Sequence, residues 1–155
     1  MRSVKWVVMP AIAVLALAGC GGGSGTKSAS TSTGRGGSTG SPEAEGGQST
    51  IGGLTFNSHG SKNVSGMSSV EVEADSFYFE PSVLIGTPGQ HLTVNLKNSA
   101  SIPHNFTLQA QGINKDLDPK SKATVQVTFP MSGVLSFWCE YHKSSGMAGG
   151  LKLSS

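Results

Sequence analysis

The sequence predicts an all-β fold, a Greek-key β-sandwich or barrel, over residues 51–155. Hydrophobic and polar residues alternate in this part, which is the period of a half-buried strand. Gly, Pro and Asn residues separate the alternating runs at short intervals, and no run shows a long helical period. A segment of this length is an ordinary size for one domain.

The expected strands follow one another along the chain. The clearest covers residues 91–97 and places Leu92, Val94 and Leu96 on one inner face. The same alternation predicts further strands at residues 70–73, 105–108, 123–129, 134–138 and 147–153. Between them, residues 115–122 are expected to form a polar connection, and residues 52–67 a loop or an edge strand.

The N-terminus has the pattern of a signal peptide over residues 1–19. Arg2 and Lys5 precede an apolar stretch, residues 6–17, that is too short to span a bilayer as a mature helix. The run Leu-Ala-Gly-Cys, which ends at Cys20, resembles a bacterial lipobox. This resemblance implies that Cys20 carries lipid and becomes the mature N-terminus. The alternative is ordinary cleavage after a small residue.

Residues 20–50 are expected to be a flexible linker. Gly, Ser and Thr supply 22 of the 30 positions in residues 21–50, and two alanines are the only aliphatic residues, so the segment cannot bury a core. As a random coil it reaches about 30 Å. With lipid at Cys20, we expect the domain to stay close to the extracytoplasmic face of a bacterial membrane without entering it.

Charge excludes one class of partner. Residues 51–155 hold seven lysines, no arginine and seven acidic residues, so the net charge of this part is zero. A nucleic-acid-binding surface needs a basic stripe, and none is present in the sequence. We therefore expect no nucleic-acid partner, and contact with the membrane only through the anchor at Cys20.

Four residues suggest a metal site. Cys139, His142 and Met147 follow one another with the spacing C-x2-H-x4-M, and His104 lies upstream where a strand is predicted to begin. Taken singly, each residue favours a plain structural role in the core or in a loop. Together, soft sulfur and imidazole are the donors of a copper ion that cycles between Cu(I) and Cu(II), so the order and spacing predict one mononuclear type 1 copper site.

The cysteine count supports this prediction. The chain has two cysteines, and if Cys20 carries lipid, Cys139 is the only thiol left in an exported protein. Exported thiols usually pair into disulfides, and this one would have no partner. A bound metal would protect it from oxidation.

Two segments resemble the halves of a plastocyanin-like cupredoxin, a type 1 blue-copper protein. One contains Pro103-His104-Asn105, the other runs from Cys139 to Met147, and the resemblance covers residues 70–153. It implies that the histidines bind through imidazole nitrogen, the cysteine as thiolate, and the methionine as a weak axial ligand. It also implies that Asn105 ties the two ligand loops together and directs a backbone N–H to the sulfur.

Two features depart from the family pattern. The family's face around the exposed histidine is commonly apolar, whereas Lys143, Ser144 and Ser145 follow His142 here. The family often has proline directly before the loop histidine, where this chain has Tyr141. A proline would stiffen the loop, so the rigidity of this loop does not follow from the resemblance. The binuclear copper site of oxidases is disfavoured, because it needs two cysteines in the loop.

The sequence thus predicts a membrane-tethered, extracytoplasmic electron carrier whose partners are redox proteins. Electrons are expected to pass to and from these partners through His142. Four ligands leave no open position for a substrate, so an enzyme is not expected. The alternative is a copper-binding lipoprotein for storage or delivery, which would use the same ligands. Delivery favours exposed ligands and extra methionine or histidine clusters, and the sequence does not show them.

Overall fold

The structure is a computed structural model that describes residues 46–155, so the predicted signal peptide, Cys20 and most of the predicted linker lie outside it. Within the described residues the secondary structure consists of strands and two short 3-10 turns. No helix in this part has the length and hydropathy that crossing a bilayer would require.

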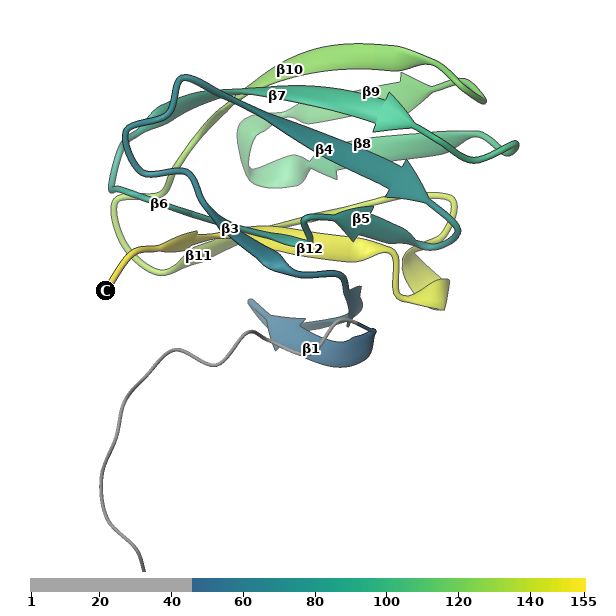
Figure 1. The fold of residues 1–155 in the computed structure, drawn as a ribbon. Helices are drawn as coiled ribbons and strands as arrows, with labels where there is room; N and C mark the ends of the chain where they lie inside the picture. Colours follow the sequence, from purple (N-terminus) through teal and green to yellow (C-terminus); the bar gives the residue numbers. More distant parts are fainter. Residues whose placement is uncertain (1–45) are drawn as a thin grey trace, which may run out of the picture. The chain divides into compact units, whose positions relative to one another are not determined.

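Twelve strands form two facing sheets and a hairpin (Figure 1). The strands are β1 (Gly47–Ile51), β2 (Leu54–Ser58), β3 (Ser61–Asn63), β4 (Ser69–Asp75), β5 (Tyr78–Glu80), β6 (Val83–Gly86), β7 (His91–Asn98), β8 (His104–Leu108), β9 (Ile113–Leu117), β10 (Lys122–Thr128), β11 (Val134–Trp138) and β12 (Ala148–Leu153). One sheet has the order β10-β7-β4-β5, and the other has the order β3-β6-β12-β11-β8-β9. This two-sheet sandwich confirms the all-β prediction.

The core lies between the two sheets. On β7, Leu92, Val94 and Leu96 are almost fully buried, as their alternation predicts. This strand pairs with β10 in the antiparallel sense and with β4 in the parallel sense. On the other side, Phe106 of β8 and Phe137 of β11 each meet Phe79 of β5 nearly edge to face, with ring centroids 5.9 and 5.3 Å apart. These rings fix the two strands that carry metal-ligand candidates at their ends.

Regular structure begins earlier than the sequence indicates. Residues 47–50 were expected in the linker, but they belong to β1, which pairs with β2 through a turn at Gly52 and Gly53. Both turn glycines have positive φ, which suits a tight hairpin. Ile51 and Phe56 of this hairpin are buried with Ala148 in a second, smaller core cluster. The hairpin is stable here because it covers the outer face of the six-stranded sheet.

The predicted polar connection over residues 115–122 is wrong in its first part. Ile113–Leu117 forms β9, which pairs with β8 at the edge of the six-stranded sheet and places Asp116 opposite Asn105. Only the two end residues of β9 contact the core, because the three polar residues between them are exposed. An edge strand tolerates such a polar sequence, so the period-two signal is lost.

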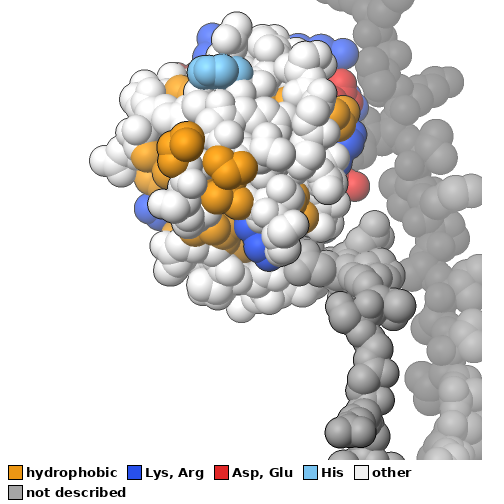
Figure 2. Space-filling model, turned by 90° about the vertical axis from the view of Figure 1, so that its left-hand side faces the viewer, with side chains coloured by type: hydrophobic (Ala, Val, Ile, Leu, Met, Phe, Trp, Pro, Cys, Tyr) orange, Lys and Arg blue, Asp and Glu red, His pale blue; other side chains and the backbone are white. Residues whose placement is uncertain are grey.

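The two ends of the sandwich differ in character. Because β11 runs from Val134 to Trp138, the loop that follows it and the loop that precedes it lie at opposite ends. The loop that follows β11 carries Cys139 and His142. At the other end, hydrophobic side chains gather on a surface with few charges (Figure 2). Met131, which is 77% exposed, precedes β11 at that end.

Candidate metal centre

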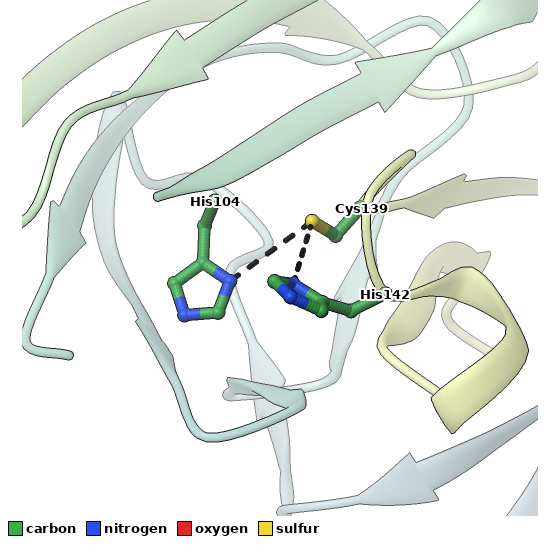
Figure 3. A group of neighbouring side chains, drawn as sticks. All are labelled: His104, Cys139 and His142. Carbon is green, nitrogen blue, oxygen red and sulfur yellow. Dashed lines mark hydrogen bonds between the residues drawn. The ribbon is translucent and has the colours of Figure 1, made fainter. Parts of the chain in front are cut away.

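Three of the four predicted ligands converge at one end of the sandwich. His104 is the first residue of β8, and Cys139 directly follows β11. These strands are antiparallel neighbours, so the start of one meets the end of the other. His142 comes from the loop that follows, just before the 3-10 turn η2 (Lys143–Ser145). Figure 3 shows both imidazole rings directed at the cysteine sulfur.

The distances suit a shared ion. The Cys139 sulfur lies 4.0 Å from His104 Nδ1 and 3.6 Å from His142 Nδ1, and all three donor atoms lie within 4.8 Å of one another. A first-row ion such as zinc binds sulfur at about 2.3 Å and imidazole nitrogen at about 2.0 Å. The sum of these two bond lengths exceeds both sulfur–nitrogen distances. One ion can therefore bind the sulfur and either nitrogen at the same time. Residues 46–155 contain no other such group of His, Cys and acidic side chains.

Burial sets the protonation of the donors. His104 and Cys139 are fully buried, and His142 is half-buried. Burial, helped by the charge of His142, lowers the pKa of His104, so its imidazole is neutral and has a lone pair to offer. Burial raises the pKa of the Cys139 thiol, although backbone N–H groups oppose this. A metal that binds the thiolate therefore displaces a proton.

His104 has an unusual environment for a structural residue. Its Nε2 atom is buried and has no hydrogen-bond partner within the described residues. Leaving a buried polar atom unpaired costs about 1–3 kcal/mol, and most buried polar groups avoid this cost. A side chain chosen for packing alone would be apolar here. The cost is understandable if the other nitrogen, Nδ1, serves the shared site with Cys139.

Asn105 contacts the sulfur through its backbone. Its N–H donates to Cys139 Sγ at 3.3 Å, the kind of contact that tunes a metal–thiolate bond. Its side-chain amide donates to β9 rather than to the ligand loop: the acceptors are Asn114 and Asp116, at 2.7 and 2.9 Å. Asp116 also accepts from the hydroxyl of Tyr141, at 2.7 Å. The side-chain link between the two ligand segments therefore passes through β9.

Met147 closes the ligand loop. Its side chain is fully buried, its N–H donates to the carbonyl of His142, and its carbonyl accepts from the N–H of Cys139. These two backbone hydrogen bonds, 3.1 and 3.0 Å long, hold the loop ends together. Binding of the thioether as the axial ligand stays a prediction.

Two residues near the site were not found from the sequence. The Phe77 ring lies 4.8 Å from the His142 ring, and the Asn57 side chain donates to the carbonyls of Phe77 and Ser145. Asn57 lies in a segment without a readable pattern. Phe77 is part of the segment that resembles the cupredoxin family, but no motif gives it a role.

Comparison with known proteins identifies the family. Residues 49–151, more than half of the chain, match the family described as "Cupredoxin-like domain", and the chain belongs to it. In this family, the cluster of His104, Cys139, His142 and Met147 is typical of a type 1 copper site. The family resembles small blue-copper electron carriers, which are typically not enzymes.

The chain is similar to several solved structures at low identity. The metal-binding domain of the Cu(I)-exporting P-type ATPase of Streptococcus pneumoniae, solved with Cu(I), is 11% identical, with a TM-score of 0.50 over 61% of this chain and 97% of that one. A reduced auracyanin from Roseiflexus castenholzii is 19% identical, with a TM-score of 0.48 over 57% and 98%. A mutant fern plastocyanin is 24% identical, with a TM-score of 0.44 over 55% and 100%.

Proposed function

We propose that this protein is a membrane-tethered, extracytoplasmic electron carrier that uses one copper ion. The observation that carries the proposal is the convergence of Cys139 Sγ with the Nδ1 atoms of His104 and His142 within 4.8 Å. One thiolate and two imidazoles match the trigonal donor set of blue-copper electron-transfer sites. His104, Cys139, His142 and Met147 would hold the ion.

The chain's own residues make such a site suited to electron transfer. Bound copper supplies a one-electron couple between Cu(I) and Cu(II). His104 and Cys139 are fixed at the ends of paired strands, so their donor atoms need little movement when the charge changes. Burial of both keeps water away, and the Asn105 N–H stabilises negative charge on the sulfur. His142, which is half-buried, offers the route to a redox partner.

Tethering to the membrane rests on Cys20 and the residues after it. With lipid at Cys20, the domain would meet redox proteins at the extracytoplasmic face of the membrane. We expect the full-length protein in the membrane fraction of expressing cells and the Cys20→Ala variant outside that fraction. An equal distribution of both proteins would contradict the lipid anchor.

The alternative, copper storage or delivery, uses the same ligands. Burial of His104 and Cys139 supports electron transfer over delivery, since an ion that is handed to another protein needs a ligand open to exchange. Two rates on the copper-loaded, full-length protein separate the functions. These are electron self-exchange and the loss of copper to a chelator.

An electron carrier exchanges electrons many orders of magnitude faster than it loses copper. We therefore expect electron self-exchange of this protein to be much faster than its loss of copper to the chelator. Copper loss to the chelator that keeps pace with electron exchange would overturn the proposal in favour of delivery.

A further inference from the structure

The hairpin formed by β1 and β2 reaches the loop that carries His142. We propose that Asn57, near the end of β2, is a positioning residue of the copper site, and that it holds this loop in place. The role rests on the proposed copper chemistry, although Asn57 belongs to no ligand motif. It acts through the loop, without contact to a donor atom of the site.

Asn57 makes two hydrogen bonds to the ligand loop. Its backbone N–H donates to the carbonyl of Gly146 at 2.9 Å, and its side-chain Nδ2 donates to the carbonyl of Ser145 at 2.9 Å. Both acceptors lie between His142 and Met147. Asn57 therefore fixes the segment that connects these two predicted ligands.

The same amide also reaches the neighbour of His142. Asn57 Nδ2 donates to the carbonyl of Phe77 at 3.0 Å, and the ring of Phe77 lies 4.8 Å from the ring of His142. Both Nδ2 contacts are carbonyl oxygens, which only accept, so the orientation of the amide is settled by its partners. Both protons of one amide are thus used on the surroundings of His142.

Close approach depends on a glycine in the loop. A Cβ atom at Gly146 would lie 2.9 Å from Asn57 Oδ1, and this glycine has a φ of +84°. Glycine permits both the close contact and the left-handed backbone. The loop is therefore shaped to receive the Asn57 side chain.

The hairpin itself is held firmly. Ile51 and Phe56 are buried against the outer face of the six-stranded sheet, and Ser136 Oγ of β11 donates to the carbonyl of Ile51 at 3.1 Å. The carbonyl of Asn57 accepts from Ser82 Oγ at 3.3 Å. Asn57 is therefore presented to the loop from a fixed support.

The test compares three variants of the full-length protein. Asn57→Ala removes the side-chain amide, and Asn57→Asp keeps its shape but replaces the donor by an acceptor that faces two carbonyls. Ser136→Ala is the matched control, because it removes a hairpin hydrogen bond that involves neither Asn57 nor a residue of the loop. Hydrogen exchange over residues 143–147 is measured without copper, and the rate of copper release to a chelator is measured after loading.

Both Asn57 variants should exchange the loop amides on the order of ten-fold faster than the wild type, because two amide hydrogen bonds are lost. Copper release should accelerate by a similar factor. Ser136→Ala should change both quantities less than two-fold, while exchange on β7 is unchanged in all three variants. Should Asn57→Ala fail to fold, Asn57→Ser gives the same comparison.

The inference is overturned if the Asn57 variants and Ser136→Ala show equal rates of loop-amide hydrogen exchange and equal rates of copper release. The proposed function fails separately, when the wild type forms no blue copper complex. Loop exchange in the copper-free protein still decides the role of Asn57 in that case.

Discussion

Tyr141 stands where the family often has a proline, and its hydroxyl supplies an anchor for the ligand loop. It donates to Asp116 on β9, which also accepts from the Asn105 side chain. A carboxylate acceptor makes such hydrogen bonds stronger than neutral ones. Two residues that flank the predicted ligands, Asn105 after His104 and Tyr141 before His142, therefore share one carboxylate.

Tyr141→Phe removes only the hydroxyl of this arrangement. We expect hydrogen exchange of the ligand-loop amides in the copper-free protein to rise a few-fold, because the loop loses its link to β9. Tyr78→Phe is the matched control, since no hydrogen bond of its hydroxyl is found within the described residues. Equal exchange in the two variants would show that Asp116 does not anchor the loop.

The carboxyl of Asp116 makes the stability of the folded protein depend on pH. Hydrogen bonds from Asn105 and then Tyr141 hold its pKa below the ordinary value of 3.8. A group whose pKa is lower in the folded state contributes stability that is present above its unfolded pKa and is lost as the pH falls through its folded pKa. Asp116→Asn lacks this contribution at every pH.

Urea unfolding from pH 7 to pH 3 measures the effect. The wild type should be more stable than Asp116→Asn at pH 7, by a constant margin down to about pH 5, and the margin should narrow below 3.8. A margin that does not depend on pH would contradict this assignment.

At the scale of elements, β12 shows how closely neighbouring segments pack against one strand. This strand lies between β6 and β11 and directly follows Met147. A Cβ at Gly149 would come within 2.1 Å of the Ser82 carbonyl and 2.7 Å of the Phe137 ring. There is no room there for a side chain.

Gly149→Ala should therefore lower the free energy of unfolding by about 2 kcal/mol or more, because backbone as well as side chains must shift. Gly47→Ala on β1 is the control, since a Cβ there meets nothing within 4 Å. It should change stability by less than about 0.5 kcal/mol. Denaturant unfolding of both variants decides the point, and similar losses would contradict the packing described for β12.

Sequence patterns predict some elements of this fold and miss others for a physical reason. Strand β7 is readable because one of its faces is buried and the other is polar. Strands β1 and β9 are mostly polar, and β9 contacts the main core only at its two end residues, so their structure comes from their pairing partners. The Asn57–Ser145 contact joins residues 88 positions apart, and no local pattern encodes it. The C-x2-H-x4-M motif is readable because its chemistry is specific.

At the scale of the whole molecule, the two ends of the sandwich differ in the residues that they expose. The metal centre and the half-buried His142 lie at one end, next to the partly exposed ring of Phe77. Met131 projects from the other end. If electrons pass through His142, copies of the protein should exchange electrons with the Phe77 end in contact.

Phe77→Glu should slow electron self-exchange several-fold at low salt, because it brings like charges together at that contact. Added salt should restore part of the rate by screening. Met131→Glu adds the same charge at the other end and should leave the rate within two-fold of the wild type. Equal slowing by both variants would show that electrons do not leave at the His142 end.

The proposed function depends on copper binding by the Cys139 thiolate together with His104 and His142. The optical spectrum of the oxidised, copper-loaded, full-length protein tests it most directly, with Cys139→Ser beside it. We expect intense blue absorption that disappears on reduction and is absent from the variant. A colourless oxidised copper complex, or a blue band that survives in Cys139→Ser, would show that the Cys139 thiolate does not form a type 1 copper site.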